Sequence, residues 1–214
     1  MGKKLGPDLF DPGELKPLPE AARRNRITVV LGAKGTGKSF WTKTDLASSL
    51  QSRESLYVWD SEDEYGGQIA GRRLVEAPHP EAMDWAKSAG APPVSVRFNA
   101  APRDQAHVAA AAAWLTPPST VVFEEVHKVC PHGTPPEWFV NMVSTARHRA
   151  CSLYLTSQRP ARVPKDLVAN ADRVVIFRLG NEPDRRALFA SLGDPRILTD
   201  TPDLELGQHL LIET

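Results

Sequence analysis

The residues with the clearest chemical pattern form the run Gly32–Ala33–Lys34–Gly35–Thr36–Gly37–Lys38–Ser39. Their spacing, Gly-x-x-x-x-Gly-Lys-Ser, is typical of a loop that binds the phosphates of a nucleotide. Glycines have no Cβ and adopt conformations closed to other residues, so they let main-chain N–H groups approach a polyphosphate. Those N–H groups and the positive end of a following helix attract the anion. The run therefore predicts a P-loop that binds ATP.

Two side chains of this loop have specific expected roles. Lys38 is expected to reach the β- and γ-phosphates, and the Ser39 hydroxyl is expected to be one ligand of Mg²⁺. We expect every residue from Gly32 to Ser39, and the adjacent Phe40, to contact the nucleotide. The full pattern is more specific than a lone Gly-x-Gly-x-x-Gly, so a chance glycine-rich turn is the weaker interpretation.

A second candidate group is the acidic pair Glu124–Glu125, which directly follows the apolar run Thr120–Phe123. An apolar strand that delivers two acids to its carboxyl end is what a P-loop ATPase needs as its second motif. We expect Glu124 to hold Mg²⁺ through water and Glu125 to orient or deprotonate the attacking water. An acidic strand end without a role is the competing interpretation.

The elements that must position these residues alternate between strands and helices. The second strand ends at Asp60, whose position predicts that it faces the nucleotide. Alternation of this kind predicts an α/β domain with a mostly parallel sheet that is flanked by helices on both faces. The expected strands are 27–31, 56–59, 94–98, 120–123, 152–156, 173–178 and 209–212, and the expected helices are 38–50, 81–89, 104–115, 137–149, 164–170 and 183–191.

Composition restricts the class of protein. A chain of 214 residues with 41% hydrophobic and 24% charged residues suits one soluble domain with a substantial core. Cys130 and Cys151 lie far apart without a Cys-x-x-Cys pattern, so we expect buried thiols and no structural metal site. No apolar run approaches the roughly 18 residues of a membrane span, and we expect a cytoplasmic protein without a signal peptide.

The first 25 residues differ from the rest of the chain. They contain Pro7, Pro12, Pro17 and Pro19 and few large apolar residues. Such a composition predicts an extended arm, either a frayed tail or a segment that binds a partner. We therefore expect two parts, an arm over 1–25 and a motor domain over 26–214.

Residues 26–214 resemble the FtsK–HerA superfamily of DNA-pumping ATPases. The most specific part is Ser157–Gln158–Arg159–Pro160 followed by Val175–Ile176–Phe177–Arg178–Leu179, and the loop at 32–39, the acids, Ala146–Arg147 and Leu206–Gly207–Gln208 agree with it. The resemblance implies a RecA-like (ASCE) P-loop sheet and homo-oligomeric rings, expected to be hexamers, with ATP sites between subunits. The family usually has Asp-Glu at the position of Glu124–Glu125, and the longer Glu124 side chain can still hold a water of Mg²⁺.

By position in that family, Gln158 is the polar sensor at a strand end and Arg147 is an arginine finger given to a neighbouring subunit. The strand that ends at Gln158 should lie beside the first strand. Arg147 precedes that strand, about five residues or 17 Å from its sensor end, so it is too far to serve its own γ-phosphate. Arg149 is the second candidate for this role.

A motor of this size, without the extra domains of larger relatives, resembles the genome-packaging ATPases of membrane-containing icosahedral viruses. This resemblance implies transport of double-stranded DNA without sequence preference and a capsid or portal-vertex partner, with the protein joining the virion at the packaging vertex. Three other classes stay open: a cellular HerA- or FtsK-type translocase, a small-molecule P-loop kinase, and a non-hydrolysing interaction protein. A partition-type switch is disfavoured because Ala33 stands where that class has lysine.

The net charge of the chain is zero, so any contact with DNA must come from local patches. Residues 51–90 contain eight acids and four bases, whereas residues 147–186 contain nine bases and four acids. A ring multiplies one or two basic residues per subunit, which is enough to attract the phosphates of DNA. No helix-turn-helix or zinc pattern predicts reading of a base sequence.

Overall fold

The computed structural model describes residues 26–77, 93–99 and 105–214. The predicted arm over 1–25 and the predicted helix at 81–89 lie outside these residues. Within them, an eight-stranded sheet has the order β10-β9-β1-β8-β7-β2-β6-β5. Its strands are β1 (Ile27–Leu31), β2 (Ser55–Asp60), β5 (Val75–Glu76), β6 (Ser95–Asn99), β7 (Ser119–Phe123), β8 (Cys151–Ser157), β9 (Arg173–Ile176) and β10 (Leu210–Glu213).

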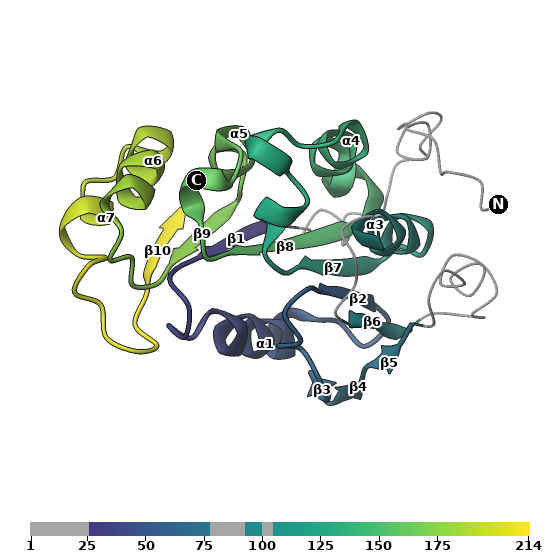
Figure 1. Cartoon of the computed structure of the whole chain (residues 1–214). Helices are drawn as coiled ribbons and strands as arrows, with labels where there is room; N and C mark the ends of the chain where they lie inside the picture. Colours follow the sequence, from purple (N-terminus) through teal and green to yellow (C-terminus); the bar gives the residue numbers. More distant parts are fainter. Residues whose placement is uncertain (1–25, 78–92, 100–104) are drawn as a thin grey trace.

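Every pair of neighbouring strands in this sheet is parallel except β9 and β10. Figure 1 shows α1 beneath the sheet and α3, α4, α5 and α6 above it, so helices cover both faces as predicted. A small hairpin of β3 (Gln68–Ile69) and β4 (Arg72–Arg73) lies on the α1 side. The helices are α1 (Lys38–Ser49), α3 (Gln105–Leu115), α4 (Glu137–Thr145), α5 (Lys165–Ala169), α6 (Glu182–Leu192) and α7 (Arg196–Thr199).

The core lies between the sheet and its helices. All five residues of β1 and all five of β7 are buried, which is expected of strands that helices cover on both faces. The alanine-rich helix α3 packs against β2 and β7 and buries its residues from 109 to 114. Cys130 and Cys151 are both buried and free of disulfides, as predicted. No helix in the described ranges is both long and apolar enough to span a membrane.

The centre of the sheet brings three chain segments together. Strand β8 lies between β1 and β7 and runs parallel to both, so the prediction that it borders the first strand is confirmed. Leu31 is paired with Ser157, and Phe123 is paired with Leu155. The residues that follow β1, β7 and β8 therefore leave the sheet at the same edge, which is where α/β proteins bind ligands.

Two predicted elements end at least two residues earlier than expected. Helix α4 stops at Thr145, and a 3₁₀ turn, η5 (Ala146–Arg149), leads through Ala150 with φ 53° into β8. Strand β9 ends at Ile176 rather than 178, because β1 ends at Leu31 and the chain opposite turns into the P-loop. The short strands β3, β4 and β5 and the helix α7 were not predicted, since segments of two to four residues have no periodicity to detect.

Candidate nucleotide-binding site

The loop after β1 is held by the two strands that flank it. The N–H of Gly32 donates to the carbonyl of Ser157 at 3.2 Å, and the N–H of Ala33 donates to the carbonyl of Arg178 at 3.0 Å. A Cβ on Gly32 would lie 2.6 Å from Cβ of Phe177, so only glycine fits between the loop and that side chain. The loop is therefore fixed to the sheet at its first two residues.

The other end of the loop is the N-terminus of α1. Gly37 is its N-cap residue, with φ 106°, and no side chain caps the first turn. The first N–H groups of a helix have no partner within the helix, so here they are available to an anion. This uncapped, glycine-lined helix end fits the phosphates of a nucleotide.

Lys38 crosses the loop. Its Nζ donates to the carbonyl of Ala33 at 3.0 Å, and the residue is only 6% exposed. Burial lowers the pKa of Lys38, although the charges of Glu125, Glu64 and Glu124 act in the opposite direction. The lysine of the loop and the two acids after β7 are therefore close enough to interact electrostatically.

The carboxyl of Glu124 contacts residues at the end of β2 and in the loop after it. Its Oε2 accepts a hydrogen bond from the N–H of Glu62 at 2.6 Å, and its carboxyl is hydrogen-bonded to that of Asp60. Burial, together with this contact and the Asp60 charge, raises the pKa of Glu124 to about 9. In the absence of a cation, Glu124 is therefore a protonated acid that shares its proton with Asp60.

The sequence predicts that Asp60 faces the nucleotide, but the structure directs its side chain into the protein. It is fully buried, and its two oxygens accept hydrogen bonds from the N–H groups of Glu64 and Tyr65, both at 2.9 Å, and from Nε of Arg97 at 2.6 Å. Burial alone would raise the pKa of Asp60, but these bonds and the one from Glu124 outweigh it and lower the pKa. Asp60 therefore fixes the loop after β2 instead of contacting a ligand.

The carboxylate that contacts the predicted Mg²⁺ ligand is Glu64, which the sequence analysis did not assign. The Ser39 hydroxyl donates a hydrogen bond to Oε2 of Glu64, and Nζ of Lys43 donates to the carbonyl of the same residue at 2.5 Å. Its signal in the sequence was its place in the acidic stretch after the second strand, but the strand-end position favoured Asp60 over it.

The described residues contain no group of three His, Cys, Asp or Glu side chains that would hold a metal by themselves. Mg²⁺ in nucleotide enzymes keeps several waters and uses one or two protein ligands plus phosphate oxygens. The assignment of Ser39 and Glu124 as protein ligands of Mg²⁺ stays a prediction, and in this structure the Glu124 carboxyl is hydrogen-bonded to Asp60.

Glu125 has an unusual backbone. It lies in the left-handed region with φ 53° and ψ 55°, and a 3₁₀ turn, η3 (Val126–Lys128), follows it. Its Oε2 accepts hydrogen bonds from the N–H of Gln158 at 2.9 Å and from Nδ1 of His127 at 3.0 Å. Burial would raise the pKa of Glu125, but these bonds and the charge of Lys38 hold it below its usual value. Glu125 is therefore ionised at neutral pH and able to accept a proton.

The remaining predicted residues lie at opposite ends of β8, with Gln158 after the strand and Arg147 before it. Gln158 directly follows the strand at the P-loop edge and is half-buried. Arg147 lies in η5 at the opposite end, as predicted. The guanidinium of Arg149 lies 4.9 Å from the ring centroid of Trp114 and donates to the carbonyl of that residue at 3.3 Å, so Arg149 is already engaged within its own subunit.

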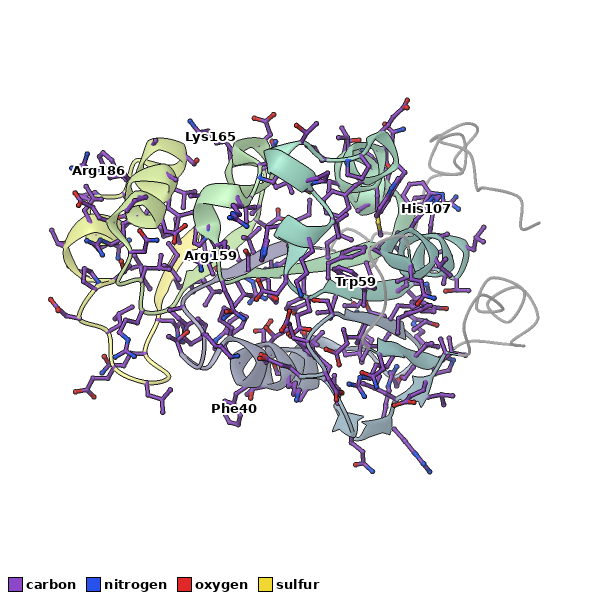
Figure 2. The ribbon with its side chains drawn as sticks, in the orientation of Figure 1. Phe40, Trp59, His107, Arg159, Lys165 and Arg186 are labelled. Atoms are coloured by element: carbon purple, nitrogen blue, oxygen red, sulfur yellow. The ribbon has the colours of Figure 1, made fainter. Side chains whose placement is uncertain are left out.

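Phe40 is the outermost residue assigned to the nucleotide. It projects from α1 into solvent and is 77% exposed (Figure 2). The loop is also joined to the C-terminal segment, because the N–H of Gly207 donates to the carbonyl of Thr36 at 3.2 Å.

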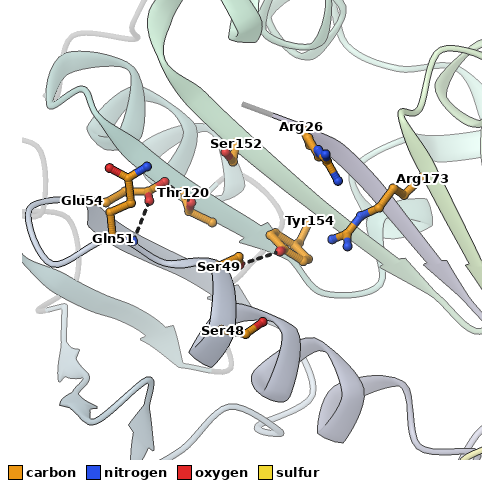
Figure 3. A pocket seen from close by; sticks show the side chains of 9 residues that line it. All are labelled: Arg26, Ser48, Ser49, Gln51, Glu54, Thr120, Ser152, Tyr154 and Arg173. Atoms are coloured by element: carbon orange, nitrogen blue, oxygen red, sulfur yellow. Dashed lines mark hydrogen bonds between the residues drawn. The ribbon is translucent and has the colours of Figure 1, made fainter. Parts of the chain in front are cut away.

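A separate polar cavity of about 490 Å³ lies at the amino ends of the strands, beside the end of α1 (Figure 3). In it the Tyr154 hydroxyl donates to Asp45 at 2.6 Å, and Arg173 is ion-paired with the same carboxylate at 2.5 Å. None of the residues assigned to ATP lines it. Its lining residues are Arg26, Ser48, Ser49, Gln51, Glu54, Thr120, Ser152, Tyr154 and Arg173.

Comparison with known proteins supports the fold. The chain matches no protein-family model, and no curated protein is similar to it in sequence. The genome-packaging NTPase B204 from Sulfolobus turreted icosahedral virus 2, in complex with AMPPCP, has a TM-score of 0.70 and 16% identity, over 88% of this chain and 92% of that chain. VirB4 of Thermoanaerobacter pseudethanolicus has a TM-score of 0.58 and 12% identity, over 96% of this chain and 92% of that chain.

A third similar structure, the monomer form of the pCW3 conjugation coupling protein TcpA with ATPγS, has a TM-score of 0.54 and 16% identity. The alignment covers 90% of this chain and 58% of that one. At such identities the comparison shows the fold alone, and that fold is the P-loop sheet that the predicted resemblance implies. The chain therefore has the mostly parallel, helix-flanked sheet of the P-loop NTPases.

Proposed function

We propose that the protein is an ATPase that moves double-stranded DNA, and that it packages a viral genome into a preformed capsid. One observation carries the ATPase part. The P-loop after β1, the acids after β7 and Gln158 after β8 meet at one edge of three adjacent parallel strands. A nucleotide-binding protein without hydrolysis would not need the acid and the sensor beside the loop.

In this proposal the N–H groups of the loop and Lys38 bind the phosphates of ATP. Glu125 accepts the proton of the attacking water, and Gln158 orients that water or the γ-phosphate. Arg147 from a neighbouring subunit stabilises the negative charge of the transferring phosphoryl group. Ser39 and Glu124 would hold Mg²⁺, which would neutralise charge on the phosphates.

The main alternative is a small-molecule P-loop kinase. A kinase transfers the phosphoryl group to a second substrate, so it needs a pocket for that acceptor and has less need of a carboxylate that activates water. Glu125 is ionised and anchored at the site, which favours hydrolysis. A cellular HerA- or FtsK-type translocase has the same site, and only the partner proteins distinguish it.

Support for DNA as the partner comes from the neighbours and from surface charge. Two of the similar structures are a genome-packaging NTPase and a conjugation coupling protein. Arg159, Arg162, Lys165 and Arg178 are exposed in the basic part of the chain. Figure 2 shows Arg159 near the centre of the view, close to where the strands end.

The test of the ATPase is a pair of variants at one site. Lys38→Ala should lose nucleotide binding or turnover, whereas Glu125→Gln should bind ATP and fail to hydrolyse it. Duplex DNA should change the rate of the wild-type enzyme. If the protein transfers phosphate to a small molecule and its ATPase rate does not respond to DNA, the kinase becomes the better assignment and the translocase is wrong. Genes for capsid proteins beside the gene for this chain would favour packaging.

A further inference from the structure

His127 has no role in the steps described above, although it contacts both strand ends that form the site. It lies in η3, two residues after Glu125, and its side chain is 14% exposed. Its Nδ1 lies 3.0 Å from Oε2 of Glu125 and 2.9 Å from Oγ of Ser157. The imidazole therefore connects the acid after β7 with the last residue of β8.

The backbone explains how His127 reaches the carboxylate of a residue so near in sequence. The left-handed conformation of Glu125 reverses the chain, and the N–H of Lys128 donates to the carbonyl of Glu125 at 2.7 Å. A non-glycine residue in this conformation is strained, so surrounding contacts must maintain it. The N–H of Glu125, which donates to Oγ1 of Thr156 at 3.3 Å, is one such contact.

The direction of the hydrogen bonds follows from the groups involved. Oε2 of Glu125 already accepts the N–H of Gln158, so Nδ1 of His127 is taken as the donor of its contact with the same oxygen. Oγ of Ser157 accepts from the N–H of Arg159 at 3.0 Å. The N–H of Gln158 donates to the same carboxylate oxygen, Oε2, at 2.9 Å. Among the described residues, all hydrogen bonds to the Glu125 carboxylate fall on Oε2, and Oε1 is left for the reaction.

We propose that His127 is a positioning residue for Glu125. Its Nδ1–H and the N–H of Gln158 fix Oε2, so that Oε1 faces the attacking water. The inference rests on the proposed function, because it needs Glu125 to be the base. His127 itself touches neither ATP nor water. Residues that orient a catalytic group in this way change activity by about 10–100-fold when they are removed.

Three substitutions test the position of the donor rather than its mere presence. Asparagine carries an N–H at the same number of bonds from Cα as Nδ1, glutamine carries it one bond further, and leucine has none. His127→Asn should therefore keep most of the turnover, while His127→Gln and His127→Leu should lose about 10–100-fold in kcat. Binding of a non-hydrolysable ATP analogue with Mg²⁺ and the melting temperature should stay as in wild type.

Equal rates for all three variants would overturn the inference, and so would losses of rate that follow losses of melting temperature or analogue affinity. If His127→Leu fails to fold, the Asn and Gln variants still decide, because both are polar and of similar size. Glu125→Gln separates a failure of the proposed catalytic base from a failure of the positioning role of His127. If Glu125→Gln hydrolyses ATP as wild type does, the proposed base is wrong. If it is inactive while His127→Leu turns over normally, only the positioning role fails.

Discussion

The Ser39 hydroxyl and the Glu64 carboxylate are hydrogen-bonded across 25 residues of sequence, with Ser39 as the donor. A hydroxyl that binds a cation uses an oxygen lone pair, so its proton must be directed elsewhere. The Glu64 carboxylate accepts the hydrogen bond that this proton makes. The carboxylate thus orients Ser39 in the same way that outer carboxylates orient histidines bound to zinc.

Glu64→Ala should for this reason weaken the contribution of Mg²⁺ to nucleotide binding by about 10–100-fold. Binding of the nucleotide without Mg²⁺ should not weaken, because the loop and Lys38 are unchanged. Titration of an ATP analogue with and without Mg²⁺ measures both quantities. Asp63→Ala is the matched control, since Asp63 is exposed and pairs with Arg97 instead of Ser39. An equal effect of the two variants would contradict the assignment.

The proton on Glu124 makes the stability of the metal-free protein depend on pH. The folded protein holds this proton up to about pH 9, whereas the unfolded chain releases it near the ordinary value of 4.5. Between these values the folded state binds more protons, so the stabilisation is complete below 4.5 and is lost as the pH rises toward 9. The pKa of Asp60 is lowered, so Asp60 stays ionised throughout this window.

Glu124→Gln should remove this pH dependence, since its amide is neutral at every pH and can still donate to Asp60. The slope of wild-type stability should be at most about 1.4 kcal/mol per pH unit. Denaturant unfolding at pH 5, 7 and 8.5 in the presence of a chelator measures it. A variant with the same decline as wild type would show that another group carries the proton.

Arg147 is expected to act in a neighbouring subunit. Arg147→Ala should keep ATP affinity and assembly and lose nearly all turnover, because an arginine finger contributes roughly 10³–10⁵ in rate. Mixing inactive Arg147→Ala subunits with inactive Glu125→Gln subunits should restore activity, since a mixed ring contains intact interfaces.

Arg149 supplies the control for this experiment. Because its guanidinium stacks on Trp114, Arg149→Ala should lower the melting temperature and leave turnover per folded subunit nearly unchanged. If Arg147→Ala rings are active on their own, the trans role is wrong.

Binding of duplex DNA should be independent of sequence and sensitive to salt. The slope of log affinity against log salt is about −0.9 for each phosphate that a basic residue neutralises. Arg159→Ala should weaken binding and reduce this slope, because Arg159 is exposed at the P-loop edge of the sheet. Arg186→Ala should have little effect, since Arg186 is paired with Glu182 at 2.6 Å. Filter binding at several salt concentrations compares the two.

The sequence predicts the sheet well because its central strands are continuous apolar runs that end at loops with recognisable chemistry. Strand β1 begins and ends where the sequence places it, and β7 and β8 differ by one residue at each changed end. Periodicity and motifs determine such elements locally. The short strands β3 to β5 depend on pairing between distant residues, which a local pattern does not reveal.

The site residues divide in the same way, into those that a local motif identifies and those that depend on contacts between distant residues. The pattern of the loop selects Lys38 and Ser39 without a structure, because the spacing itself is diagnostic. Among the acids after β2, the sequence favours Asp60, and the structure buries it against Arg97 while Glu64 reaches Ser39. That choice depends on how a loop folds back over the sheet. His127 was missed for a related reason, since its contact with Ser157 joins residues 30 positions apart.

Strand β8 has a consequence for a whole assembly. Its seven residues run from the turn that carries Arg147 to the residue before Gln158, a distance of about 20 Å. In a ring of the proposed kind, those two ends belong to different ATP sites. A shift of β8 caused by hydrolysis at one site would move the arginine that serves the next site. A single strand in the middle of the sheet would then set the order in which the subunits hydrolyse ATP.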